Sequence, residues 1–208
     1  TQLLDNALSP TKLPLQTYLL VCPMAMDRAL PRHLQDIIVV ALGFERSMPV
    51  EVWLQPSLPR TIQGLKRDDV SWLHLDTHGS RDGTMVMLYP TREGSQMVGS
   101  DVLPEAIETP FVMLVGCALT ASHESIGQAL LLRGVKSVFG PCAIFQSLGI
   151  ANSEEEQANW YRTFYSALLS GNDVGSSLLK ARTITKGGLL KFGWLIMGSS
   201  LLHFGSHI

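Results

Sequence analysis

Two apolar segments of this 208-residue chain end in side chains that could perform nucleophilic chemistry. Residues 72–77 run into His78 and Gly79, and residues 111–116 run into Cys117. If both segments are neighbouring parallel strands, the imidazole and the thiol lie at the same edge of the sheet, the one formed by the carboxyl ends of the strands. α/β proteins bind their ligands at this edge. The imidazole would then take the thiol proton, and the thiolate would attack a carbonyl carbon. The N–H groups of Gly79 and Cys117 are the natural donors to the resulting oxyanion.

The same segments also admit a metal site or a purely structural role. His74, Asp76 and His78 alternate along the chain, so they could face one side of a strand as metal ligands do. Successive side chains on one strand face diverge at about 6–7 Å per pair, which disfavours a tetrahedral metal site. His74 is more simply a hydrogen-bonded core histidine, and Asp76 a buried carboxylate or a wall of the active site. A buried Cys is more often an inert small hydrophobe than a nucleophile.

The pattern along the chain predicts strands that alternate with helices. This order implies a mainly parallel sheet covered by helices on both faces, with the helices of 154–185 together on one face. Residues 1–16 are expected to be a lead-in segment or the end of a linker, and 17–208 to form one domain. The predicted strands are 17–21, 50–54, 72–77, 84–88, 96–98, 111–116, 135–139 and 192–197. The predicted helices are 30–44, 57–68, 100–107, 125–132, 154–169 and 174–185.

Composition excludes several classes of function. Lys and Arg total 16 against 18 Asp and Glu, and this net charge of −2 argues against direct nucleic-acid binding. No apolar run approaches the ~18 residues of a membrane span. Charged residues make up 16%, below the usual share of about 25%; with the absent initial methionine, this leads us to expect a domain of a larger protein. Cys22, Cys117 and Cys142 form no disulfide framework and suggest the reducing cytoplasm.

The order of the motifs resembles that of CHAT domains, which are caspase-like cysteine peptidase domains of clan CD. Residues 72–79 resemble the first signature of the family, an apolar strand that runs into His-Gly. Residues 112–120 resemble the second, an apolar strand that runs into a small residue, Cys and a nearby Thr. Residues 134–140, 164–181 and 194–198 are similar to three later motifs in the same order. The match covers roughly residues 50–198.

The resemblance implies a caspase-like three-layer α/β/α sandwich and a cysteine endopeptidase with a His78–Cys117 dyad and no cofactor or metal. It also implies a parent protein with TPR or other sensor repeats and an activator, as in regulated peptidases of the bacterial defence type. Thr77 stands where the family commonly has Cys, and Ala118 where it has an acidic residue. These departures concern substrate contacts rather than the dyad.

The resemblance places Val115, two residues before the Cys, beside the first specificity pocket. Because Val115 is uncharged and Met24 and Met26 would add pliable apolar surface, we expect an apolar residue such as Met or Leu before the scissile bond. Asp76 would instead select Arg or Lys if it reaches the pocket, and Arg28 would select Asp or Glu. The candidates for substrate contacts are Met24, Met26, Arg28, Asp76, Val115, Cys142 and Ala143.

The sequence therefore predicts a cytoplasmic cysteine endopeptidase that cleaves protein substrates and is controlled by a larger parent protein. The alternatives are a non-catalytic CHAT-like scaffold that binds a partner, and a metal-dependent hydrolase that uses His74, Asp76 and His78. The loops 80–96 and 141–152 are expected to be long and to need a partner that orders them, so the isolated domain should be weakly active.

Overall fold

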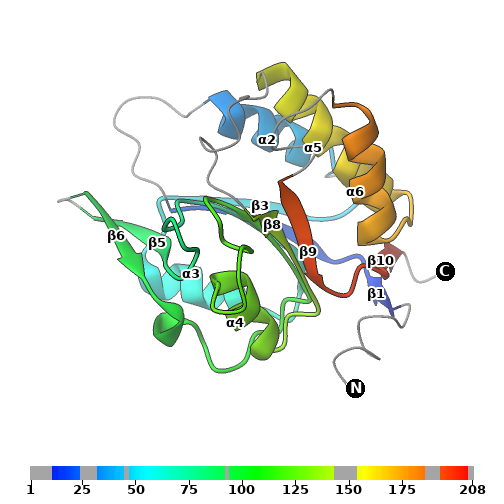
Figure 1. Cartoon of the computed structure of the whole chain (residues 1–208). Helices are drawn as coiled ribbons and strands as arrows, with labels where there is room; N and C mark the ends of the chain where they lie inside the picture. The colour runs from blue at the N-terminus through cyan, green and yellow to red at the C-terminus, as the bar shows by residue number, and fades with distance from the viewer. Residues whose placement is uncertain are drawn as a thin grey trace.

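The structure, a computed structural model, describes residues 11–23, 32–44, 47–91, 94–142, 154–185 and 193–205. Its centre is a six-stranded sheet with the strand order β3-β2-β4-β7-β8-β9 (Figure 1). Neighbouring strands run parallel, except that β9 runs antiparallel to β8. The strands of this sheet are β2 (Thr17–Cys22), β3 (Val50–Leu54), β4 (Val70–Asp76), β7 (Phe111–Val115), β8 (Ser137–Pro141) and β9 (Trp194–Gly198).

Helices cover both faces of this sheet, which confirms the predicted α/β/α architecture with a mainly parallel sheet (Figure 1). One face carries α2 (Arg32–Leu42), α5 (Glu154–Leu169) and α6 (Val174–Thr183), and the other carries α3 (Leu58–Leu65) and α4 (Ile126–Leu132). The prediction that the helices of 154–185 lie together is also confirmed, because α5 and α6 pack against each other.

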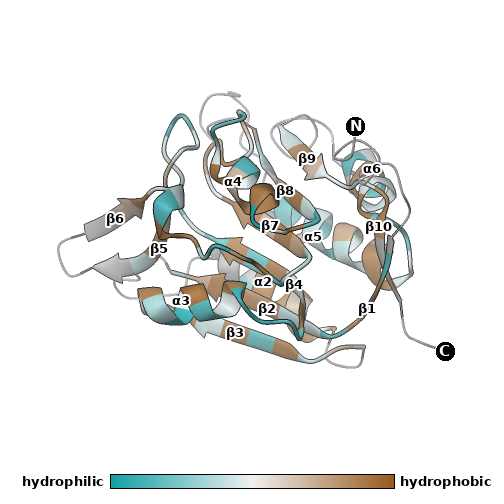
Figure 2. Ribbon diagram, turned by 90° about the horizontal axis from the view of Figure 1, so that it is seen from below, coloured by the Kyte–Doolittle hydropathy of each residue, from teal (hydrophilic) through white to brown (hydrophobic). Residues whose placement is uncertain are grey.

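Strands β2, β4 and β7 are buried along their whole length, and apolar residues run along them between the helical layers (Figure 2). Alternate side chains enter opposite cores. The core under α5 is aromatic: the Phe139 ring lies 4.8 Å from Phe164, and Trp72 stacks on Tyr165 at 5.6 Å between centroids. Because truncation of a buried Phe to Ala typically costs about 3–5 kcal/mol, this layer contributes strongly to stability.

Local signals in the sequence explain where the helices start and stop. The Ser125 and Asp173 side chains accept hydrogen bonds from the backbone N–H groups of Gln128 and Ser176, and so cap α4 and α6. Gly171 ends α5 with φ +81°, a left-handed conformation that favours glycine.

Two elements differ from the sequence-based expectation. The predicted helix 100–107 is only the 3-10 turn η1 (Ser100–Val102), capped by Gly99, because Leu103 is extended ahead of Pro104. The described part of the segment 1–16 contains a strand that the sequence pattern does not indicate. This strand, β1 (Thr11–Pro14), pairs in parallel with β10 (Leu202–Gly205) beside the main sheet.

Strands β5 (Val86–Thr91) and β6 (Gly94–Val98) form an antiparallel hairpin, close to the hairpin predicted from 84–88 and 96–98. Among the described residues, no helix has the length and apolar character needed to cross a membrane.

Candidate active site

The sheet carries His78 and Cys117 at the carboxyl ends of two neighbouring strands. β4 and β7 pair in parallel with Asp76 opposite Val115, and the Thr77 N–H donates to the Val115 carbonyl at 2.8 Å. His78 and Cys117 each follow two residues after this pair. The two residues therefore share one edge of the sheet, at which open α/β sheets bind ligands.

Gly79 lies against the Cys117 turn, which we define as residues 116–120. A Cβ atom at Gly79 would lie 2.2 Å from the Cys117 carbonyl oxygen, whereas real Cβ atoms essentially never come closer than 3.0 Å to another atom. Only glycine permits this approach. The contact fixes the spacing between the backbone that carries the imidazole and the backbone that carries the thiol.

The Cys117 turn has an uncommon backbone conformation that its neighbours enforce. Ala118 has φ +54°, which residues with a side chain rarely adopt. The Leu119 carbonyl accepts the Gly127 N–H of α4 at 2.8 Å, and the Thr120 hydroxyl donates to the Gly140 carbonyl of β8 at 2.9 Å. Backbone strain of this kind persists only where the surroundings determine it, and it concentrates at functional sites.

The reactive groups at this edge are accessible. The His78 side chain is exposed and the Cys117 side chain is half-buried. Among the described residues, no acceptor receives the backbone N–H of Gly79 or of Cys117. A thiol, an imidazole and two available N–H donors at one edge are the groups that acyl transfer requires.

The segment after β4 is held by the β5–β6 hairpin. The Thr77 hydroxyl donates to the Met87 carbonyl at 2.5 Å, and the Met87 N–H donates to the His78 carbonyl at 3.0 Å. The expectation of a long loop at 80–96 is therefore wrong for its described part, because residues 80–85 form a compact turn that leads into the hairpin. Most of the second predicted loop, 143–152, lies outside the described residues.

His74 is a core residue, as its simpler interpretation predicted. Its side chain is fully buried, and its Nδ1 atom lies 2.9 Å from the Tyr18 hydroxyl and 2.8 Å from the Tyr165 hydroxyl. His78 is exposed at the end of the same strand, so the two imidazoles do not converge. Within the described part of the chain, no three His, Cys, Asp or Glu side chains gather as a metal site would need.

A buried polar layer lies on the α5 face of β4. Burial raises the pKa of the Tyr18, Tyr161 and Tyr165 hydroxyls above the usual value, and the negative charge of Asp76 raises each of them further. The Asp76 side chain is only 2% exposed. Asp76 therefore interacts electrostatically with the tyrosines on the inner side of the edge that carries His78.

The candidates for substrate contacts fall into two groups. Val115 is 6% exposed and directly opposite Asp76 in the register of β4 and β7. Cys142 follows the last residue of β8 and is half-buried, and its N–H donates to the Gly193 carbonyl at 2.8 Å. These three residues lie at or near the edge that carries Cys117. The remaining candidates, Met24, Met26, Arg28 and Ala143, lie outside the described residues.

Sequence reasoning missed the residues that organise the backbone at this edge. In the sequence, Thr77 stands out only as a departure from the family pattern, and the left-handed conformation of Ala118 has no sequence signal. The Asp82-Gly83 dipeptide is a recognisable turn signal, but the chain alone does not indicate that this turn packs on the Cys117 turn.

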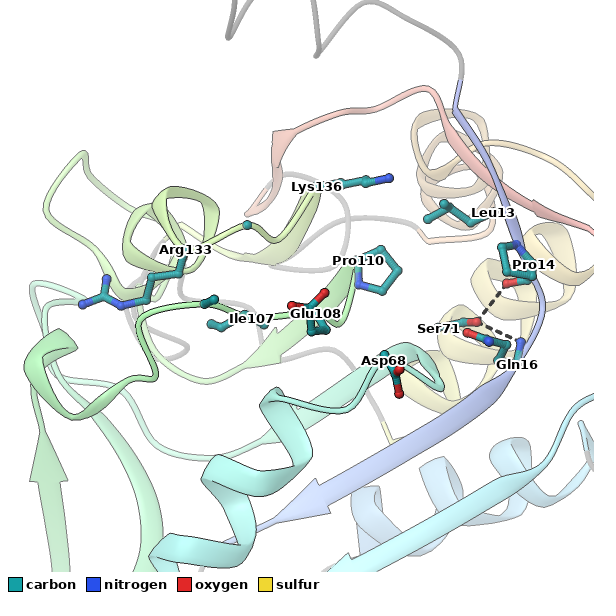
Figure 3. Close-up of a pocket in the computed structure, with 12 residues that line it drawn as sticks. Leu13, Pro14, Gln16, Asp68, Ser71, Ile107, Glu108, Pro110, Arg133 and Lys136 are labelled. Carbon is teal, nitrogen blue, oxygen red and sulfur yellow. Dashed lines mark hydrogen bonds between the residues drawn. The ribbon is translucent and has the colours of Figure 1, made fainter.

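A separate cleft of about 500 Å³ lies at the opposite edge of the sheet (Figure 3). Its lining comes from β1, from Ser71 of β4 and from the segments that precede β2, β4, β7 and β8, and it includes Asp68, Glu108 and Lys136. The Ser71 hydroxyl donates to the Pro14 carbonyl at 2.9 Å on one of its walls. No His or Cys lines this cleft among the described residues, so it does not offer the thiol chemistry of the Cys117 edge.

Comparison of the sequence with known proteins does not assign the chain to a family, because no family model and no curated protein matches it. Membership of the CHAT family therefore stays a prediction. Solved structures do match. One separase–securin complex of Saccharomyces cerevisiae aligns with a TM-score of 0.64 and 15% identity, over 95% of this chain and 13% of that chain. A second separase–securin complex aligns with a TM-score of 0.58 and 14% identity, over 98% of this chain and 14% of that chain.

The Arg-specific cysteine proteinase gingipain R aligns with a TM-score of 0.61 and 11% identity, over 97% of this chain and 51% of that chain. The chain thus spans a small part of the separase chain and about half of the gingipain chain. At such identities the likeness establishes the fold. The chain has the caspase-like α/β fold of the separase and gingipain structures, with a mainly parallel six-stranded sheet.

Proposed function

We propose that the protein is a cysteine endopeptidase in which Cys117 is the nucleophile and His78 the general base and acid. The observation that carries this proposal is the parallel pairing of β4 with β7, because it sets both residues at one edge of the sheet. The accessible side chains and the caspase-like fold support it.

The proposed reaction uses groups of this chain alone. The His78 imidazole accepts the Cys117 proton, and the thiolate attacks the carbonyl carbon of the scissile peptide bond. The N–H groups of Gly79 and Cys117 donate to the oxyanion of the tetrahedral intermediate. His78 donates the proton to the leaving amine as the peptide C–N bond breaks. The acyl group then remains on Cys117 as a thioester. A water molecule then hydrolyses the thioester, with His78 as the base.

We propose an apolar residue such as Met or Leu before the scissile bond, because Val115 offers no charge to a side chain beside it. Asp76 is the competing determinant, since a carboxylate that reaches the substrate would favour Arg or Lys. A peptide library with each residue type before the scissile bond distinguishes the two determinants. Preferred cleavage after apolar residues would support Val115 as the determinant, and strict cleavage after Arg or Lys would support Asp76.

We further propose that a larger parent protein with TPR or other sensor repeats, together with its activator, controls the peptidase in the cytoplasm. Three free cysteines in one chain are consistent with a reducing compartment. The separase structures are complexes with securin, so a peptidase of this fold can be isolated with a bound protein partner.

Substitution of the dyad tests the proposal. Cys117→Ala and His78→Ala should each lower peptide hydrolysis roughly 10³-fold or more, because residues that act as one catalytic unit fail together. Melting temperatures should stay close to that of the wild type, since His78 is exposed and Cys117 belongs to neither hydrophobic core. Matched controls are Cys22→Ala and His123→Ala, whose imidazole is 89% exposed, and both should retain substantial activity.

Two outcomes would overturn the proposal. Full hydrolysis by Cys117→Ala would exclude the thiol mechanism. Absence of hydrolysis by the folded wild-type protein, both alone and in its parent assembly, would favour the non-catalytic scaffold that binds a partner.

A further inference from the structure

A compact turn follows His78 and Gly79 in the chain. We call residues 80–85 the Asp82 turn, because one carboxylate oxygen organises it. Asp82 Oδ1 accepts the Ser80 hydroxyl at 2.6 Å, the Thr84 N–H at 3.1 Å and the Thr84 hydroxyl at 2.9 Å. The turn is closed at its base, where the Ser80 N–H donates to the Met85 carbonyl at 3.0 Å.

The tip of the Asp82 turn packs on the Cys117 turn. Gly83 is buried with φ +74°, and a Cβ atom there would lie 2.0 Å from the Ala118 carbonyl oxygen. Neither the conformation nor the space admits a side chain. The Gly83 carbonyl also accepts the Ile126 N–H at 2.9 Å, at the start of α4. The Asp82 turn thus contacts the residue after Cys117 and the helix that follows it.

Two glycines pack closely against the backbone of the Cys117 turn. Gly79 abuts the carbonyl of Cys117, and Gly83 abuts the carbonyl of Ala118. Both glycines belong to the segment that follows His78, so the same stretch of backbone carries the imidazole and supports the thiol. Ala118 keeps its left-handed conformation between them.

We propose that Asp82 is a positioning residue that sets the geometry of Cys117 relative to His78 through the contact of Gly83 with Ala118. The expected effect of Asp82 on catalysis rests on the proposed function. The expected effect of Asp82 on the conformation of the Cys117 turn rests on the contacts alone. Asp82 touches no reacting atom, and its side chain is exposed. Its three hydrogen bonds lower the pKa of its carboxyl to about 2, with the Ser80 hydroxyl as the largest cause, so it is ionised at any pH useful for a peptidase.

Loss of the carboxylate should relax the turn without unfolding the domain. The hydroxyl of Ser80 and both donors of Thr84 lose their shared acceptor, while the buried core is untouched. Because misplacement of reacting groups by about 1 Å can lower a rate ~10²-fold, even a partial shift of Ala118 should be measurable. Asn at position 82 keeps an oxygen in the place of Oδ1 and should preserve the turn.

The test compares Asp82→Ala, Asp82→Asn and the wild-type protein by peptide hydrolysis and by alkylation of Cys117 with iodoacetamide, read by mass spectrometry. Asp82→Ala should lower kcat roughly tenfold or more with KM nearly unchanged, and Asp82→Asn should restore most of kcat. The matched control is Asp173→Ala. Asp173 also accepts hydrogen bonds, from the Ser176 N–H at 2.7 Å and the Ser176 hydroxyl at 3.0 Å, but at the start of α6. Asp173→Ala should lower the melting temperature and leave kcat unchanged.

Amide hydrogen exchange provides a readout that needs no activity. Asp82→Ala should speed exchange at Ala121, whose N–H donates to the Ala118 carbonyl at 2.9 Å, and at Ile126. Asp173→Ala should change neither. An Asp82→Ala protein with wild-type kcat, alkylation and exchange would overturn the inference even if Cys117→Ala is inactive. Faster exchange in a protein whose wild type hydrolyses no peptide would uphold the structural part and reject the proposed function.

Discussion

Replacement of Gly79 by alanine should misalign the two reactive turns while the domain stays folded. The new Cβ would lie 2.2 Å from the Cys117 carbonyl oxygen and 2.7 Å from Leu119 Cδ2. The Leu119 side chain can rotate away, but the carbonyl belongs to the backbone of the Cys117 turn. It would have to retreat from 2.2 Å to at least 3.0 Å, a shift of about 0.8 Å. Because a misplacement of about 1 Å can cost ~10²-fold in rate, we expect a loss of that order in kcat/KM.

The assay measures peptide hydrolysis, thermal unfolding and alkylation of Cys117 in parallel. Crowding of this kind typically costs about 1–3 kcal/mol, so the Gly79→Ala protein should melt at a lower temperature but cooperatively. The matched control is Gly175→Ala in α6, where the nearest atoms to a new Cβ are 3.3 Å away, and it should keep wild-type kinetics. Wild-type kcat/KM in a folded Gly79→Ala protein would refute the claim that this contact sets the geometry of the site.

Two further predictions concern stability against pH. The pKa values of Tyr18, Tyr161 and Tyr165 are raised by burial, so their contribution to stability is complete below the unfolded pKa near 10 and is lost as the pH rises above it. Tyrosinate absorbance from these three residues should therefore appear only together with the loss of near-ultraviolet circular dichroism, and their ionisation in the folded state would contradict the burial. Hydrogen bonds from Arg67 lower the pKa of Glu51, so its contribution is present above pH 4.5 and is lost as the pH falls below it. Because this pair is partly exposed, Glu51→Gln should cost at most about 1 kcal/mol at pH 7, and the unfolding free energies of the two proteins should converge at acid pH; an undiminished difference there would contradict the ion pair.

The sequence was most informative where short-range patterns decide the structure. The strand before Cys117 was predictable because it is an uninterrupted apolar run. The strand before His78 was predictable because large apolar residues alternate with His74 and Asp76 in a short segment that ends at His-Gly. The caps at Ser125 and Asp173 were predictable because these residue types satisfy open N–H groups at helix starts.

The features that could not be predicted from the sequence depend on contacts between segments that are distant in the chain. β1 and β10 are four-residue strands that pair across almost the whole chain, so no local pattern reveals them. β9 runs antiparallel to β8, and its own residues carry no sign of that direction. The packing of Gly83 on Ala118 joins two turns that are 35 positions apart, and single residues in each turn carry no sign of the other.

Covalent capture of the nucleophile tests the central claim most directly. The wild-type protein is treated with a peptidyl chloromethyl ketone that carries leucine next to the reactive group, and the modified residue is identified by mass spectrometry. The account predicts one adduct, on Cys117 rather than on Cys22 or Cys142, and a rate of modification that falls sharply in His78→Ala. Modification at another cysteine, or an equal rate with and without the His78 imidazole, would contradict the dyad.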